Sequence, residues 1–145
     1  MLLSFLNLVS LYIIMIIKYS QYLVVLYFVV TKQYHLCKWY ILSQVVNDFI
    51  LKNICKFFMK NSNFPLIGNG NRPDSDLKSY GMPSSHALSM GFLLTSQILR
   101  GNVYWPIFLI TAVTVIRSRF TNGHHTPQQL SIGFILGSLL AMKIN

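Results

Sequence analysis

Long apolar runs, separated by shorter polar segments, dominate the pattern of the chain. A helix that crosses a membrane needs about 20 consecutive residues that are mainly apolar. The pattern predicts six candidate spans, of which the first two could instead merge into a hairpin or a single bent helix. They cover Leu2–Ile17, Tyr22–Val30 with an extension to about Tyr34, Trp39–Met59, Pro83–Leu99, Val103–Ile116 and Pro127–Met142.

The connections between these runs differ greatly in length. The stretch Lys60–Tyr80 is polar and contains several Gly and Pro residues, which is typical of a loop. The links Gly101-Asn102 and Ser118–Thr126 are short, and short links make consecutive helices antiparallel neighbours. The chain therefore crosses away from the loop in the fourth run and returns in the fifth. The link between the fifth and sixth runs is expected on the same membrane face as Lys60–Tyr80.

The sixth run carries clear helix signals. Thr126 stands at the N-cap, Pro127 at the first helical position and Gln129 at the third, which is a capping-box pattern. Small residues then recur at every fourth position, so that another helix can approach closely in lipid. This stripe consists of Gly133, Gly137 and Ala141.

Composition narrows the choice of fold class. The chain has 145 residues, which is room for one domain over 1–145, and 53% of them are apolar while only 10% are charged. A soluble domain carries about 25% charged residues, so the composition excludes a disordered tail and argues against a water-soluble globule. We expect an all-α, multi-pass membrane helix bundle of about six helices. A signal peptide at the first run is rejected, because no positive residues precede it and no small-residue cleavage site follows.

The charge of the chain is one-sided. There are 12 Lys and Arg residues against 3 acidic residues, all Asp, for a formal net charge of +9. In a membrane protein this balance suits anionic head groups or an anionic substrate such as a phosphate ester. The cations stand singly between apolar runs, whereas a nucleic-acid binder carries basic stripes on a soluble surface, so no nucleic-acid partner is expected. Cys37 and Cys55 form neither a disulfide framework nor a zinc spacing.

Polar residues gather in two parts of the sequence, and charges in membrane segments suggest function. One part holds Arg72-Pro73 and the string Tyr80–His86, and the other holds Arg117–Arg119 and Gly123–His125. Because their loops share a face, the two parts are predicted to converge at one end of the bundle. The converging side chains are Arg72, Ser84, His86, Arg119 and His125.

These residue types favour a cluster that binds an anion and acts on it. Guanidinium groups and backbone N–H groups at a helix start bind phosphate oxygens, and histidine acts as a nucleophile or a general acid. A magnesium-dependent site would need carboxylates, of which the chain has only Asp48, Asp74 and Asp76. A site without metal or other cofactor is therefore favoured. Zinc at His124-His125 is the rival, but it lacks further ligands at a usable spacing.

Three short strings resemble motifs of the type 2 phosphatidic acid phosphatase superfamily, over about residues 45–142. Met82-Pro83-Ser84-Ser85-His86 is similar to its Pro-Ser-Gly-His motif, and Ser118-Arg119 followed after five residues by His125 resembles its Ser-Arg-x5-His motif. Arg72-Pro73 resembles the end of its Lys-x6-Arg-Pro motif. Each string alone is weak, but their order, their common face and the six-helix frame together make the resemblance strong.

The resemblance implies a role for each matching residue. His125 would attack phosphorus and form a phosphohistidine, and His86 would protonate the leaving oxygen and then activate water. Cations around the phosphate would stabilise the charge that spreads in the transition state. Ser85 stands where the family has glycine, and its backbone N–H can still bind the phosphate. The clamp on the phosphate would consist of Arg72, Arg119 and Ser84.

Gln129 is the first of two departures from the family pattern. It replaces an Asp that lies one helical turn after the nucleophile, and its carbonyl can hold the imidazole tautomer but cannot stabilise imidazolium as a carboxylate does. However, His125-Thr126 followed by Gln129 resembles the dolichyl diphosphatase branch, in which Gln occurs at this place, and Tyr80–Ala87 resembles that branch too. Gln129 could also serve as a helix cap, alone or in addition.

The second departure concerns the lysine of the first motif. Seven positions before the Arg-Pro pair the chain has Pro65, so the loop looks expanded. Lys52, Lys56 and Lys60 lie at a spacing of four on one face of the third run. The local string 50–53 most resembles the family context, so Lys52 is chosen as the phosphate-binding lysine. Lys56 and Lys60 suit helix anchors at the membrane interface.

The sequence thus predicts a membrane lipid phosphatase that hydrolyses a phosphate or diphosphate ester through a phosphohistidine, without metal. A polyprenyl diphosphate such as dolichyl diphosphate is the preferred substrate, and in a eukaryotic cell the membrane would be that of the endoplasmic reticulum. The alternatives are a phosphotransferase on the same scaffold and a non-catalytic membrane protein with a decayed site. The pattern indicates no oligomeric state, membrane orientation or head-group preference.

Overall fold

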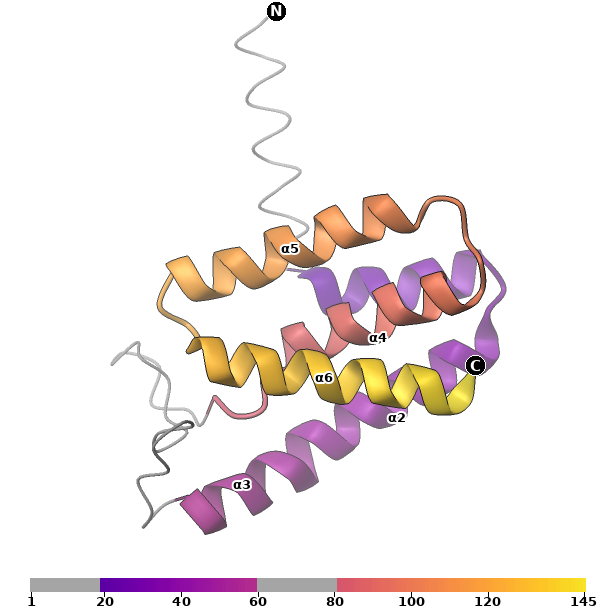
Figure 1. Cartoon of the computed structure of the whole chain (residues 1–145). Helices are drawn as coiled ribbons and strands as arrows, with labels where there is room; N and C mark the ends of the chain where they lie inside the picture. The colour runs from indigo at the N-terminus through magenta and orange to yellow at the C-terminus, as the bar shows by residue number, and fades with distance from the viewer. Residues whose placement is uncertain (1–18, 60–80) are drawn as a thin grey trace, which may run out of the picture.

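The computed structural model of the protein describes residues 19–59 and 81–145, and these residues form helices and no strands. Residues 19–30 form the first helical segment, drawn in indigo in Figure 1. The chain continues through α2 (Tyr34–Val46), the π-helical turn η1 (Asn47–Leu51), α3 (Lys52–Met59), α4 (Ser85–Leu99), α5 (Trp105–Thr121) and α6 (Pro127–Ile144). The expected all-α class is confirmed for the described part of the chain.

The helices follow the apolar runs closely, with differences at their ends. The helix of the second run ends at residue 30, because a turn at 31–33 separates it from α2. Lys32 in this turn takes a left-handed φ of 57°. The helical structure of the third run begins at Tyr34, five residues earlier than expected. The first run and the loop Lys60–Tyr80 lie outside the described residues.

Helix α5 continues beyond its apolar run. The run ends at Ile116, but the helix extends to Thr121 and includes Arg117–Arg119, which we expected largely in the link to the sixth run. Arg is a good helix former, so the end of the apolar run at Ile116 does not mark the end of the helix. The guanidinium of Arg119 is therefore carried by a helix and not by a loop.

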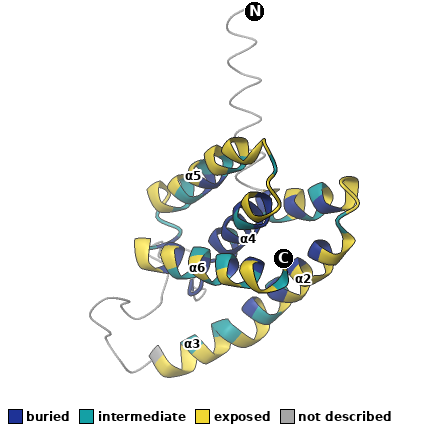
Figure 2. Cartoon of the chain, turned by 45° about the vertical axis from the view of Figure 1, so that its right-hand side comes forward, coloured by how far each residue is buried: buried dark blue, intermediate teal, exposed yellow. Residues whose placement is uncertain are grey.

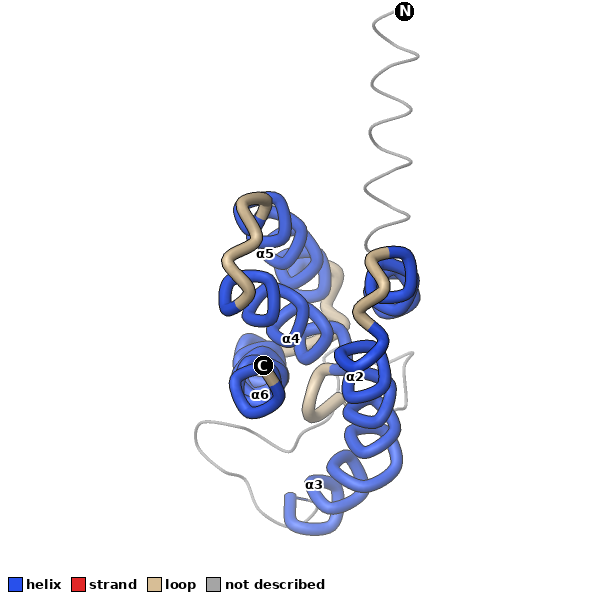
Figure 3. The backbone as a smooth tube through the Cα atoms, turned by 90° about the vertical axis from the view of Figure 1, so that its right-hand side faces the viewer, coloured by secondary structure: helices blue, strands red, loops and turns tan. Residues whose placement is uncertain are grey.

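Helix α4 is the centre of the bundle and its most buried element, as the dark blue ribbon of Figure 2 shows. α6 packs along it more extensively than any other helix, α5 covers a second side and α2 contacts a third. Figure 3 shows α4 surrounded by these three helices. Because Ser85 and His86 lie in the first turn of α4, the packing of this helix determines where they stand.

Three glycines let α4 and α6 approach until their backbones touch. A Cβ atom built at Gly133 would lie 2.5 Å from the carbonyl oxygen of Ser84. A Cβ at Gly137 would lie 2.1 Å from that of Leu88, and one at Gly91 of α4 would lie 2.2 Å from a backbone oxygen of α6. A real side chain at these positions would push the two helices apart. The close approach predicted from the small-residue stripe is confirmed, and α4 is the helix that uses it.

Aromatic rings fill the space between α4, α2 and the helical segment 19–30. Phe28, Tyr40 and Phe92 are almost completely buried, and their ring centroids lie 5.6 to 6.3 Å apart, a range in which aromatic pairs attract beyond their buried area. The Tyr40 hydroxyl and Ser89 Oγ are hydrogen-bonded at 2.8 Å, so the polar atom of the tyrosine is satisfied inside the core. This packing holds α2, and with it the turn η1, against the first half of α4.

Large apolar side chains occupy much of the outer surface. Ile107, Ile110 and Val113 of α5 are exposed, as are Phe57 and Phe58 of α3. On soluble monomers such side chains are usually scattered singly, and contiguous apolar patches mark contact surfaces. Within residues 19–59 and 81–145, no helix combines the length and the apolarity that a membrane crossing requires. The six membrane spans stay a prediction.

Gly137→Ala should lower the free energy of unfolding by about 1 to 3 kcal/mol, because the added methyl group overlaps a backbone oxygen of α4, despite the better helix propensity of Ala. The matched control is Leu139→Ala on the exposed face of the same helix, which should cost less than about 0.5 kcal/mol. Thermal unfolding of the purified full chain, followed by circular dichroism, measures both. Equal midpoints for the two variants would contradict the close contact.

Candidate functional site

The first turn of α4, the last turn of α5 and the turn before α6 meet at one end of the bundle (Figure 1). The backbone N–H of Ser84 donates to the carbonyl oxygen of Gln129 at 3.3 Å, and this bond joins the start of α4 to the first turn of α6. The antiparallel order of the helices predicts this shared end. Two strings that are far apart in the sequence, 84–86 and 125–129, therefore belong to one site.

Arg119 contacts the segments that carry both histidines of this end. Its Nη2 is hydrogen-bonded to Nε2 of His86. Its carbonyl oxygen accepts the backbone N–H of His124 at 3.1 Å and that of His125 at 3.2 Å. A guanidinium group can only donate, so Nε2 of His86 is the acceptor and carries no proton in this arrangement.

His125 is buried, with 4% of its surface exposed, and its ring is oriented by Gln129. Nδ1 of His125 lies 3.1 Å from Oε1 of Gln129, and the same oxygen accepts the backbone N–H of Thr126 at 3.2 Å. Because the Thr126 N–H requires an acceptor, the amide atom that faces it is the oxygen, and Nδ1 of His125 must then carry the proton. In the neutral ring the lone pair consequently lies on Nε2.

Gln129 reaches this place because of the local sequence at the start of α6. Thr126 Oγ1 accepts the backbone N–H of Gln129 at 3.3 Å, and the Gln129 side chain returns to the Thr126 N–H, which completes a capping box. The capping box predicted from the sequence is confirmed. The helix cap and the imidazole use the same amide oxygen, so Gln129 caps the helix and contacts His125 at once.

Ser85 is the centre of a second polar cluster, where α4 meets the start of α3. Its Oγ accepts hydrogen bonds from Nζ of Lys52 and Nδ2 of Asn47, both at 2.9 Å, and donates to Oδ1 of Asp48 at 2.8 Å. A hydroxyl has one donor and two acceptor sites, so the hydroxyl of Ser85 is fully used. Lys52 also forms an ion pair with Asp48. Lys56, one turn later on α3, is exposed.

Asn47 and Asp48 contribute to the site but carry no motif that marks them in the sequence. For Asp48 a signal exists, because it precedes Lys52 by four residues, the usual spacing of an ion pair on a helix. Asn47 precedes Lys52 by five residues. Asn47 and Lys52 reach the hydroxyl of Ser85 together because the chain forms a π-helical turn here. The wider turn brings residues five apart onto one side. Apolar periodicity does not predict such a turn.

Seven of the eight predicted site residues are described, and all seven belong to this end of the bundle. Ser84 is the N-cap of α4; it is completely buried, and its Oγ accepts the backbone N–H of Ala87 at 3.4 Å. Arg72 lies outside the described residues, as does Lys60. The seven residues brought together are Lys52, Ser84, Ser85, His86, Arg119, His125 and Gln129.

The residue types at this end suit a tetrahedral anion. α4 and α6 both begin here, so the partial positive charges of two helix N-termini add to the charges of Lys52 and Arg119. Asp48, the carboxylate of this cluster, is paired with Lys52. In the described ranges no group of three or more His, Cys, Asp or Glu side chains could hold a metal ion.

Comparison with known proteins gives two matches. A model of the PAP2 superfamily matches residues 34–144. The dolichyldiphosphatase of Saccharomyces cerevisiae is 27% identical over an alignment of 125 positions, and this alignment spans 78% of this chain and 52% of the yeast protein. The chain thus spans about half the length of this curated relative. No solved structure matches.

Ser85→Ala should lower the free energy of unfolding by about 1 to 3 kcal/mol, because the completely buried Asn47 amide loses an acceptor and the Lys52 ammonium loses another. Ser131→Ala, at an exposed serine of α6, is the matched control and should be close to neutral. Chemical unfolding of the full chain measures the difference. An effect no larger than that of the control would show that the Ser85 cluster does not hold α3 to α4.

Proposed function

The chain belongs to the PAP2 superfamily, and from this premise we propose that it is a membrane lipid phosphatase. The observation that carries the proposal is the meeting of His86, Arg119 and His125 at the end where two helices begin. The proposed substrate is a polyprenyl diphosphate such as dolichyl diphosphate. The name of the yeast relative and the string Tyr80–Ala87 support this choice.

His125 is the proposed nucleophile. The Gln129 oxygen holds the proton on Nδ1, so the lone pair on Nε2 can attack the terminal phosphorus. A P–N bond forms while the P–O bond to the leaving group breaks, and the product is a phosphohistidine. A neutral amide does not balance the positive charge of the ring as a carboxylate would, so the phosphoryl oxygens that the ring now carries supply the negative charge.

His86 is the proposed acid and base. It protonates the leaving oxygen in the first step and takes a proton from the attacking water in the second, in which the P–N bond breaks and orthophosphate leaves. Before substrate binds, Nε2 of His86 accepts from Arg119. A bound phosphate draws the guanidinium to its own oxygens, and Nε2 then takes up a proton from solvent, which it delivers to the leaving oxygen.

The phosphate oxygens are held by cations and by donors at the start of α4. Lys52 and Arg119 supply the charges, with Arg72 added by its motif, and such groups stabilise the transition state. The hydroxyl of Ser85 is already saturated, so the group that it offers is its backbone N–H. Ser84 Oγ accepts a cap bond and keeps its own proton, which it can donate to the phosphate.

The proposed setting is a membrane, that of the endoplasmic reticulum in a eukaryotic cell, with the chain as a single domain over 1–145. The exposed apolar side chains of α3 and α5 support contact with lipid. The reaction is proposed to need no metal, because nucleophile, acid and phosphate clamp are all provided by the residues above.

His125→Ala should lower the release of orthophosphate from a polyprenyl diphosphate at least about a thousandfold, because the nucleophile is lost. His124→Ala, at the adjacent histidine, is the matched control and should retain activity within a few-fold. The assay uses the purified full chain in detergent with EDTA and no added metal. Acid-labile labelling of the wild type by phosphate, absent in His125→Ala, would report the phosphohistidine.

Three results of this assay would count against the proposal. A strict requirement for magnesium would contradict the metal-free mechanism. Unchanged release of orthophosphate by His125→Ala would remove the proposed nucleophile. Transfer of the phosphoryl group to an added lipid alcohol, in preference to water, would identify a phosphotransferase.

Lys52→Met should lower kcat by about 10² to 10³-fold, because one cation that stabilises the phosphoryl oxygens is lost. Lys56→Met on the same helix should behave as the wild type, since this lysine is exposed and one turn away. Both variants are measured in the same assay, and thermal unfolding checks that they fold. A larger effect of Lys56→Met would assign the first-motif role to that lysine.

A further inference from the structure

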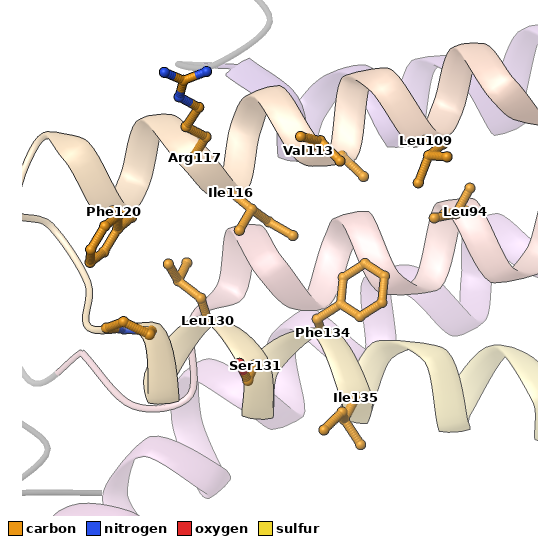
Figure 4. Close-up of a pocket in the computed structure, with 12 residues that line it drawn as sticks. Leu94, Leu109, Val113, Ile116, Arg117, Phe120, Leu130, Ser131, Phe134 and Ile135 are labelled. Carbon is orange, nitrogen blue, oxygen red and sulfur yellow. The ribbon is translucent and has the colours of Figure 1, made fainter.

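An apolar groove with a volume of about 660 Å³ runs between α5 and α6. Ile116 of α5 points across the groove toward Leu130 and Phe134 of α6, and Val113 lies beside it (Figure 4). Leu94 of α4 lines the far end, away from the site. The volume falls within the range of about 300 to 1,000 Å³ that is typical of small-molecule sites.

The groove is apolar along its length and open on its outer side. Val113, Phe120 and Ile135 line it and are 55%, 53% and 54% exposed. Arg117 contributes its aliphatic stem, and its guanidinium group points away from α6 (Figure 4). The lining of the groove therefore offers contacts to a hydrocarbon and very few hydrogen bonds.

The groove follows from the way the helices pack. The glycines let α6 lie directly against α4, and α5 covers another side of α4. α5 and α6 contact each other much less than either contacts α4. The space between α5 and α6 therefore results from the way the bundle packs. α5 and α6 line this space, and α4 closes its base.

One end of the groove adjoins the candidate site. Phe120 directly follows Arg119, whose guanidinium contacts His86. Leu130 directly follows Gln129, which orients His125. On α5 the residue next to the lining is thus a cation, and on α6 it is the amide that contacts an imidazole. A ligand with a phosphate head and an apolar chain has the same change of polarity.

We propose that the groove between α5 and α6 binds the hydrocarbon chain of the lipid whose phosphate is held beside His125. This proposal rests on the proposed function and adds the part of the site that selects a long-chain substrate. From Phe120 to Leu109 the chain would lie along about three turns of α5, or ~16 Å. The groove therefore contacts the part of the hydrocarbon nearest the phosphate.

The test fills the groove with a larger side chain and compares two substrates. Val113→Trp and Ile135→Trp should raise KM for a long-chain polyprenyl diphosphate about tenfold, within the range that a few methylene contacts supply in an apolar pocket. Their kcat/KM for isopentenyl diphosphate, whose hydrocarbon part is too short to follow the groove, should stay unchanged. The matched control is Ile110→Trp on α5, which is exposed but does not line the groove and should affect neither substrate.

Several outcomes would overturn the proposal while leaving the phosphatase function intact. One is an unchanged KM for the long-chain substrate in both groove variants, and another is an equal rise in Ile110→Trp. A third is a change from dimer to monomer in sedimentation without a change in KM, which would assign the groove to a second copy of the chain. Thermal unfolding of each variant shows whether a lost activity reflects a lost fold.

A second measurement does not depend on catalysis. A polyprenol that carries a diazirine on its first isoprene unit but no phosphate should label peptides of 109–120 and 130–135 on illumination, and Val113→Trp should reduce this labelling several-fold. Labelling spread evenly over the outer faces of α3 and α5 would overturn the groove site. If the wild type hydrolyses neither diphosphate but is labelled in the groove, the proposed function fails and the chain site stands.

Discussion

Where α4 and α6 touch, there is no room for an atom larger than hydrogen between the glycines and the facing backbone. This contact places the start of α4 beside the first turn of α6, so that Ser84 and Gln129 form a backbone hydrogen bond. Both histidines depend on it, because His86 lies in that first turn and His125 directly precedes α6. The candidate site is thus positioned by glycines, which have no side chains.

Much of this arrangement could be predicted from local patterns. The capping box and the small-residue stripe follow from residue types at fixed spacings, the shared end of three helices follows from the short links between them, and the structure confirms all three. The extension of α5 past Ile116 and the π-helical turn at Asn47 could not be predicted. Apolar periodicity reports which surface is buried, whereas helix ends and turn width depend on hydrogen bonding, which the pattern does not show.

Two side chains each serve more than one neighbour through a single oxygen atom. The amide oxygen of Gln129 accepts from a backbone N–H and faces Nδ1 of His125, and the hydroxyl of Ser85 connects Lys52, Asn47 and Asp48. In each case the geometry of a candidate functional group is tied to the integrity of a helix contact. Stability and site geometry therefore cannot be varied independently at these positions, which is a common property of buried polar networks.

Lys52 is attached to Ser85. Its position in the structure therefore does not depend on how many residues separate it from the Arg72-Pro73 pair. The ammonium group is held by α4 and by the preceding carboxylate of Asp48, and not by a fixed number of residues before the arginine. Additional residues could accumulate between the two without displacing the lysine, since longer loops cost little extra closure entropy. The spacing of such a motif would then change in the sequence, while its side chains keep the same arrangement in space.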